Sequence, residues 1–454
     1  MRAFRWGRGR LLLAGAALAV LPIIALPASA QTLEDAIRQA LRANEEVLSA
    51  SRSRDASDQD LRQARAGYLP LVDIRAGSVY QWSDNSNTVI TTPTGTRGST
   101  RGLQRTESQL TARQLLWDFG GVDSEVEQAL ARRAQNANRV REVAEVIALR
   151  TADVYIDLLR QRQLLATAQE NVRQHEAVTG RVTARLQQGR GDQADEQQAL
   201  SRLNQSRSSL AEAAGRLREA EIRYFTVVRA PPPPNMAAVR PPVASLPQNV
   251  DQAVQISEGT SPTVATFRSQ AEFARAQINA ADARFLPRID LEAGGQLNNN
   301  IDGIEGRNND ARVMVMMRYN IYSGGADMAR RGAAVARQGE AQENLRRSIR
   351  DTAELVRVSW SQLQTARDRL TVFRAQQDNA IRVRQAYDLQ FNVGTRSLLD
   401  LLDSENELYV ARSNVIDTER LSEFRVYRVF ATMGTMLQTL NIDPPPEAAV
   451  PVRR

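Results

Sequence analysis

The sequence predicts a mainly α-helical chain with membrane β-strands, built from a duplicated unit of long coiled-coil helices and four strands per chain. Residues 67–77 (GYLPLVDIRAG) recur as residues 284–294 (RFLPRIDLEAG), an offset of 217. Each copy is followed by a pair of strand-like segments and by a very long helical stretch with heptad spacing. Recurrence of this kind, in the same order, indicates a repeated structural unit rather than two unrelated domains.

The N-terminus reads as a secretory signal peptide at residues 1–30. Four arginines precede the apolar run LLLAGAALAVLPIIAL, and the small residues Ala28, Ser29 and Ala30 form a cleavage pattern. The apolar run is broken by Pro22, which is atypical of a membrane span. We therefore expect the mature chain to begin at Gln31.

Composition narrows the class of protein. The 59 basic residues are all arginine, and four of them lie in the leader, so the mature chain has 55 basic against 52 acidic residues, a net charge of about +3. That balance gives no support for nucleic-acid binding. Cysteine is absent, which excludes disulfides and a lipid-modified cysteine anchor. No apolar run after the leader reaches the roughly 18 residues that a membrane helix needs, so any membrane contact is expected through strands.

The first repeat, residues 31–230, opens with a predicted amphipathic helix over residues 32–65, capped by Thr32 with Asp35 in the capping-box position. An alternating segment follows, and a second strand-like run ends at Leu116 and Trp117. The apolar face of the alternating segment carries Val72, Ile74, Ala76, Tyr80 and Trp82, and its polar face carries Asp73, Arg75 and Gln81.

The second repeat, residues 249–440, shows the same alternation more clearly. Its first strand sets Ile289, Leu291, Ala293 and Leu297 against Asp290, Glu292 and Gln296, and its second sets Val313, Val315, Met317, Tyr319 and Ile321 against Arg312, Arg318 and Asn320. Segments of about ten residues that end in aromatic side chains are typical of tilted strands crossing a bilayer. The alternative is a pair of hairpins that cap a soluble helical bundle.

Long helices are predicted over residues 122–186 and 326–391. One heptad line of the first runs through Val140, Ile147, Val154, Ala168 and Val182, which indicates coiled-coil packing. At about 1.5 Å per residue, each helix forms a rod on the order of 100 Å long. The shorter helices, 32–65 and about 193–229, together match that length, so we expect them to stack end to end beside the rod. The proline-rich linker 231–248 and the tail 441–454 would then lie halfway along it.

Strand number constrains assembly. Four strands cannot close a barrel, since the smallest barrels need about eight, and an open edge is not tolerated in lipid. Strands that span a membrane therefore require oligomerisation: two chains would give eight strands with a filled interior, and three would give twelve with an aqueous lumen.

The turn after the second long helix reads FNVGTRSLLDLLDSENELYVAR from Phe391, and its counterpart in the first half reads RLQQGRGDQADEQQALSRL. With the duplication, the four strands and the leader, this segment resembles the TolC family of outer-membrane efflux and secretion channels, and most closely the members that serve type I secretion. The resemblance covers essentially the whole mature chain. It implies a homotrimer with a 12-stranded β-barrel in the Gram-negative outer membrane, and an α-helical periplasmic tunnel that opens at its tip.

The resemblance also assigns roles at the tip. Asp400 and Asp403 match the acidic residues that ring the tunnel entrance, and a spacing of three places them on one helix face. Arg396 and Asp195 match positions whose polar links hold the tip closed. Gly189 and Gly394 are expected to adopt the positive backbone dihedral of a tight turn. The chain departs from the family at Phe391, where a tyrosine hydroxyl takes part in a link, and at Ala194, where a threonine does.

No catalytic motif, phosphate-binding loop or zinc pair is present, so the chain is not expected to be an enzyme and no cofactor or metal is predicted. His175 lies on the heptad line, which favours a packing or surface role. The tripeptide Arg190-Gly191-Asp192 falls at the tip turn, and we attribute it to chance.

The leading functional hypothesis is a passive exit duct of a tripartite type I secretion system. By resemblance, its partners are a periplasmic adaptor (membrane fusion) protein, an inner-membrane ABC transporter or RND-type pump, and outer-membrane lipid. The second hypothesis is the outer-membrane component of a drug or small-molecule efflux pump. The rival class is a non-conducting periplasmic coiled-coil scaffold.

Overall fold

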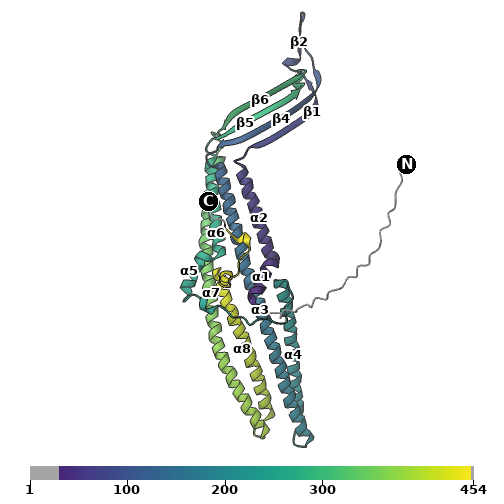
Figure 1. Cartoon of the computed structure of the whole chain (residues 1–454), viewed down its shortest axis with the longest axis vertical. Coiled ribbons are helices and arrows are strands. Elements are labelled where there is room, and N and C mark those ends of the chain that lie inside the picture. The colour runs from purple at the N-terminus through teal and green to yellow at the C-terminus, as the bar shows by residue number, and fades with distance from the viewer. Residues whose placement is uncertain (1–29, 451–454) are drawn as a thin grey trace, which may run out of the picture.

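The computed structural model describes residues 30–450 as a long helical rod with a β-sheet at one end and two helical hairpin tips at the other (Figure 1). Apart from Ala30, the predicted signal peptide lies outside the described residues, as do the last four residues of the tail. Among the residues described, none of the helices is long and apolar enough to cross a membrane.

The first half runs through helices α1 (Leu33–Ala43) and α2 (Glu45–Ala66) into strands β1 (Leu71–Ser83) and β4 (Arg101–Trp117). Helix α3 (Gly121–Gln187) then descends the whole rod, and α4 (Gln193–Val228) returns to its middle (Figure 1). Between β1 and β4, the short strands β2 (Val89–Thr92) and β3 (Gly95–Gly98) form a separate hairpin that the sequence had not indicated.

The second half repeats this order with α5 (Val250–Thr260), α6 (Pro262–Ala283), β5 (Arg288–Asn299), β6 (Arg307–Arg318), α7 (Ala326–Asn392) and α8 (Leu398–Met433). Corresponding helices have equal lengths: α1 and α5 have 11 residues, α2 and α6 have 22, α3 and α7 have 67, and α4 and α8 have 36. Tyr319 and Ile321 lie beyond the end of β6, so the alternation predicted there extends past the strand.

The prediction of one helix over residues 32–65 was wrong in one respect. The capping box of Thr32 and Asp35 is present, but the chain leaves the helix at Asn44, whose side chain accepts the backbone N–H of Glu46 and so starts α2. The corresponding break in the second half lies at Ser261, directly before Pro262. A short polar side chain at a break satisfies backbone donors that a new helix leaves unpaired.

Helix α3 is the central element, because it packs against α2 and α4 of its own half and against α6 and α8 of the other. Every residue of the predicted line Val140, Ile147, Val154, Ala168 and Val182 is buried. On α7, Val356 and Leu363, seven residues apart, are buried, whereas most of its remaining surface is exposed. The heptad pattern of α3 thus marks its seams with both halves, whereas that of α7 marks packing within the second half.

The middle of the rod is bound by polar contacts to the proline-rich segment. The Tyr155 hydroxyl of α3 lies 2.7 Å from the carbonyl oxygen of Gln31 and 2.9 Å from that of Ala237. Arg162 donates to the carbonyl oxygens of Pro233 and Pro234, at 2.8 and 3.0 Å. The segment crosses α3 near its midpoint, where α1 and α4 meet.

The C-terminal segment docks on the same helix through Glu145. The carboxylate of Glu145 accepts the backbone N–H groups of Met436 and Leu437, at 3.2 and 3.3 Å, at the start of the short helix α9 (Met436–Thr439). Burial raises the pKa of Glu145 to about 7, although both hydrogen bonds favour its charged form. Burial therefore outweighs the hydrogen bonds at this carboxyl.

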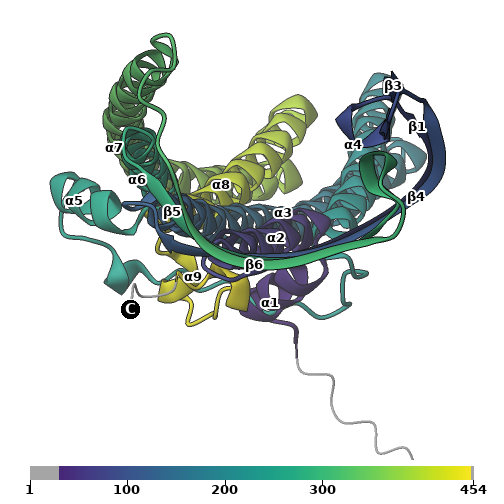
Figure 2. The same cartoon turned by 90° about the horizontal axis from the view of Figure 1, so that it is seen from above.

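The sheet segregates its side chains onto two faces. In the described chain it has four antiparallel strands in the order β1-β4-β5-β6, and from above it is strongly curved (Figure 2). The strand registers place the predicted apolar residues of β1, β5 and β6 on one face and their charged residues on the other. On the apolar face, Ile74, Leu297, Val313 and Val315 are at least 64% exposed, which a protein surface in water rarely shows.

The position of Glu145 generates a test of pH dependence. Because its pKa is raised in the folded chain, its protonation stabilises the fold fully below about pH 4.5, and this contribution is lost as the pH rises through about 7. We expect Glu145→Gln to remove that part of the pH dependence of the unfolding temperature. Glu125→Gln, an exposed change on the same helix, is the control, and an unchanged slope in Glu145→Gln would contradict the assignment.

Candidate functional site

The tip of the rod contains both predicted turn glycines. Gly189 connects α3 to α4 with a φ of 71°, and Gly394 connects α7 to α8 with a φ of 82°. Their amides donate to the carbonyl oxygens of Leu186 and Phe391, at 2.9 and 3.1 Å, and close each helix end. The predicted positive dihedrals are therefore confirmed, and they bring the ends of four helices together.

An apolar cluster joins the two hairpins immediately above these turns. Phe391 is only 6% exposed. Its partners come from the other three helices of the tip: Val178, Val182, Ala199, Leu398, Leu401 and Leu402. The guanidinium of Arg185 lies over the Phe391 ring, 4.4 Å from its centroid, and donates to the Phe391 carbonyl oxygen at 3.2 Å. Arg185 of α3 thus binds the end of α7 through the ring face and the backbone, without a tyrosine hydroxyl.

Arg396 folds back onto α7 from the start of α8. Its guanidinium lies 3.9 Å from the centroid of the Tyr387 ring, and one of its nitrogens lies 3.7 Å from a carboxylate oxygen of Asp400. The Nε of Arg396 is buried and has no hydrogen-bond acceptor within the described residues. Stacking on an aromatic face is a favourable use of a planar cation, so the Tyr387 ring is a main contact of Arg396 within one chain.

The two predicted acidic residues each face a cation. Asp403 accepts a hydrogen bond from Arg202 of α4 at 2.9 Å, and Asp400 is near Arg396. Their side chains remain 51% and 44% exposed, respectively. Both project from the first two turns of α8, so the structure places them on one exposed stripe beside the tip, with part of their charge balanced locally.

Asp195 does not meet Arg396 within a chain. It is exposed in the first turn of α4, and in the part of the chain that the structure describes its side chain forms no hydrogen bond or ion pair. The neighbouring Ala194 donates its backbone N–H to Asp192, which caps α4. A closing link from Asp195 would have to reach another copy of the chain.

One further ion pair and one hydrogen bond join the halves above the tip, and sequence reasoning missed both. Arg181 of α3 binds Asp388 of α7 at 2.8 Å. Arg384 of α7 binds Glu405 of α8 at 2.6 Å and donates to Gln174 of α3. Burial raises the pKa of Glu405, opposed by the adjacent Arg384. These contacts become visible only in the folded tip, because the partners lie on different helices and no shared spacing from the tip glycines relates them.

His175 is buried on α3, in agreement with the expected packing role. Its Nδ1 has no hydrogen-bond partner among the described residues, and its pKa is lowered by burial and by the charge of Arg202. Across residues 30–450, no group of three His, Asp or Glu side chains is placed to hold a metal ion.

Comparison with known proteins agrees with this architecture. The sequence profile of the family described as "Outer membrane efflux protein" matches residues 36–226 and 253–433, one stretch in each half. Outer membrane efflux protein BepC of Brucella suis is 23% identical over 90% of this chain and 86% of its own length. Alkaline protease secretion protein AprF of Pseudomonas aeruginosa is 24% identical over 84% of this chain and 80% of its own.

Solved structures share the fold. The crystal structure of CusC, studied for transmembrane channel formation, superposes with a TM-score of 0.76 at 19% identity, over 88% of this chain and 91% of CusC. The open state of the MtrE outer membrane channel of Neisseria gonorrhoeae superposes with a TM-score of 0.73 at 18% identity, over 89% of each chain. The family match spans most of the chain and both repeats, and the chain therefore belongs to the outer membrane efflux protein family, which includes TolC, as an outer-membrane efflux or secretion channel.

Proposed function

We propose that three copies of this chain form a passive exit duct for exported protein in a type I secretion system. The observation that carries the proposal is the four-stranded sheet attached to the rod of helices. Its apolar face is exposed, and among the described residues each outer strand has one unused edge. In lipid, such a sheet needs neighbours on both sides to satisfy its backbone groups. Three copies give twelve strands, enough for an aqueous lumen continued by the helices.

The choice of cargo class rests on the relatives. AprF and the proteases secretion protein PrtF of Dickeya chrysanthemi, 24% identical over 91% of this chain, are both named for protease secretion. BepC is named for efflux, and it supports small-molecule efflux as the second candidate. In either case the energy would come from an inner-membrane ABC transporter or RND-type pump, connected through a periplasmic adaptor at the tip.

Deleting the gene would separate the two cargo classes. Type I secretion predicts the loss of particular proteins from the culture medium with unchanged drug sensitivity. Efflux predicts the reverse: greater drug sensitivity and an unchanged set of secreted proteins. Purification of the crosslinked complex from cells would then identify the transporter.

Assembly and conduction test the channel itself. The purified protein should require detergent for extraction, run as a heat-labile trimer, and conduct ions in planar bilayers. A protein that leaves cells without detergent and never conducts would instead be the periplasmic scaffold.

The acidic stripe of the tip makes a prediction about ion selectivity. In a trimer, Asp400 and Asp403 give six carboxylates near the entrance, which favours cations. We expect Asp400→Ala with Asp403→Ala to reduce the cation preference measured from reversal potentials. Trimer stability should change little, because the exposed pair of Asp403 and Arg202 contributes at most about 1 kcal/mol. Asp378→Ala, an exposed change on α7 away from the tip, is the control, and unchanged selectivity in the double variant would refute the ring.

Arg396 makes a prediction about closure. Its contacts with Tyr387 and Asp400 fix the start of α8 against α7, so Arg396→Ala should loosen the tip and raise the leak current of the channel without its partners. Arg190→Ala removes an exposed arginine from the other tip turn and should leave the current unchanged. An equal current in both variants would mean that the apolar cluster and Arg185 hold the tip closed instead.

A further inference from the structure

The two outer strands of the sheet carry complementary charges on their unused edges. Within residues 30–450, β1 pairs only with β4, and β6 pairs only with β5. On the polar face, β1 carries Asp73 and Arg75, and β6 carries Asp310, Arg312 and Arg318. Which of these side chains meet between two copies depends on how far the strands slide along one another.

The sheet itself shows the direction and size of that sliding. A row of paired residues runs from Leu71 through Arg113 and Glu292 to Met314. At the end near the helices, β1 stops at this row, but β6 continues four residues past Met314 to Arg318. At the far end, β1 extends twelve residues beyond the row to Ser83, and β6 only seven, to Arg307.

Measured from this row, the ends of β6 are therefore displaced from those of β1 by four residues near the helices and by five at the far end. Both displacements have the same direction, and they accumulate over three strand-to-strand steps. A fourth step, from β6 to the next copy's β1, brings the shift to about six. Odd shifts are excluded, because they would set the polar face of one copy beside the apolar face of the next. In a ring of three copies the shift per copy is added three times around twelve strands. With about 3.3 Å per residue and 4.8 Å between strands, shifts of four, six and eight residues per copy give strand tilts of roughly 35°, 45° and 55°.

Closed membrane barrels have strand tilts of about 35–45°, which leaves shifts of four and six. A shift of four sets Asp73 opposite Met316 and the apolar Val79 opposite Asp310, so neither acid gains a partner. A shift of six sets Asp73 opposite Arg318. A shift of eight, already too steep, would set Arg75 opposite Arg318, which is repulsive. Only a shift of six residues gives both an allowed strand tilt and a pair of opposite charges.

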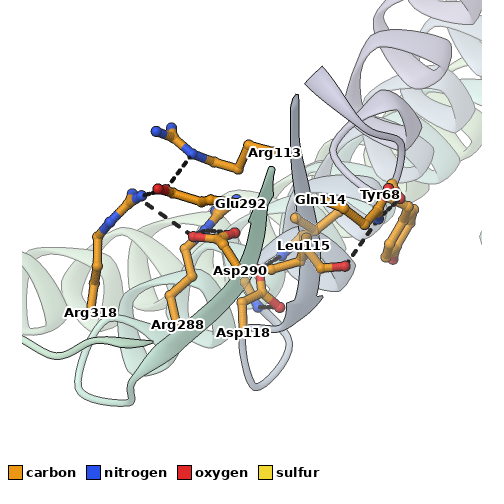
Figure 3. Close-up of polar contacts among 11 residues, drawn as sticks. Tyr68, Arg113, Gln114, Leu115, Asp118, Arg288, Asp290, Glu292 and Arg318 are labelled. Atoms are coloured by element: carbon orange, nitrogen blue, oxygen red, sulfur yellow. Dashed lines mark hydrogen bonds and ion pairs between the residues drawn. The ribbon is translucent and has the colours of Figure 1, made fainter. Parts of the chain in front are cut away.

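The environment of Arg318 suits an additional carboxylate. Arg318 binds Glu292 at 2.5 Å and lies 3.8 Å from the buried Asp290 (Figure 3). Glu292 also binds Arg113 of β4 at 2.9 Å. Cations and anions therefore alternate across the strands on the polar face, in a row of alternating charges that runs from Arg113 to Arg318. The Arg318 side chain is still 47% exposed. Asp73 is exposed and forms no hydrogen bond or ion pair in the described chain.

We propose that copies of this chain join β6 to the next copy's β1 in the register that pairs Arg318 with Asp73 and sets Met314 opposite Gly77. The inference rests on the proposed trimeric channel and adds the register and the ion pair that fix its closure. The same register sets Met317 opposite Ile74 and Val315 opposite Ala76 on the apolar face. The row of alternating charges then continues from one copy to the next around the lumen.

Disulfide trapping tests the register directly, because the natural chain contains no cysteine. A side chain at position 77 meets open space. Opposed residues of antiparallel strands have Cα atoms about 4.5–5.5 Å apart, within the range of a disulfide. Gly77→Cys with Met314→Cys should therefore yield mostly covalent trimer on non-reducing gels. Within one chain, β4 and β5 separate these positions, so the bond must join two copies.

Two matched pairs serve as controls for this experiment. Gly77→Cys with Arg312→Cys reports a shift of four, and Gly77→Cys with Asn308→Cys reports no shift. Stronger crosslinking by either control than by the Met314 pair would overturn the register. A conducting oligomer crosslinked in a control register overturns this inference alone, whereas a water-soluble monomer that never crosslinks overturns the proposed channel as well.

The ion pair has its own test. Asp73→Asn should lower the temperature at which the detergent-resistant trimer dissociates, because Arg318 loses the partner from the next copy. Arg75→Gln lies two residues along the same edge and faces Met316 in the proposed register, so it should leave that temperature unchanged. Equal losses in both variants would point to the unshifted register, in which Asp73 meets Arg312 and Arg75 meets Asp310, and would overturn the proposal.

Discussion

The backbone groups along β1 and β6 set the condition that the rest of the structure has to meet. An exposed apolar face suits lipid, yet lipid offers no hydrogen-bond partner to an unpaired strand edge, so the sheet is stable there only with neighbours on both sides. The segregation of the two faces follows from the alternation along the strands, and the sheet as a whole is curved (Figure 2). In the proposed channel, one chain supplies four adjacent strands of the barrel, and further copies are needed to close it.

The helices extend that wall away from the membrane. Because α3 contacts helices of both halves, it holds the two repeats together along nearly the whole rod. Its buried seam is rich in small and β-branched side chains, such as Ala144 and Val140, which allow close approach of neighbouring helices. Most of the surface of α7 beyond its contacts with α5, α6 and α8 is exposed, which in the proposed assembly would be the face toward a neighbouring copy.

Arginine suits the chemistry of this protein in a way that lysine would not. Arg185 and Arg396 use the planar guanidinium to cover the rings of Phe391 and Tyr387 while donating to, or pairing with, nearby oxygens. A compact ammonium cannot stack in this manner. The contacts at the tip are therefore a mixture of ring stacking, exposed ion pairs and one small apolar cluster. Such contacts are individually weak, as suits an element that in the proposed function has to open.

The sequence by itself determined the features that depend on local or periodic patterns. These include the order of the long helices and the four main strands, the capping box at Thr32, the positive dihedrals of Gly189 and Gly394, and the two faces of the strands. Each follows from a preference of a few neighbouring residues or from a repeat of two or seven. The family was also recognisable from the duplicated order and the motif that begins at Phe391.

Only the tertiary structure decided which distant side chains meet. Asn44 is compatible with a helix interior or a cap, and in the folded chain it caps α2 at the point where α1 ends. The pairing of Asp403 with Arg202, the stacking of Arg396 on Tyr387 and the burial of Asp290 join segments whose relative register no local pattern specifies. The stagger between β1 and β6 likewise accumulates over three strand pairings, so it exists only when the whole sheet is assembled.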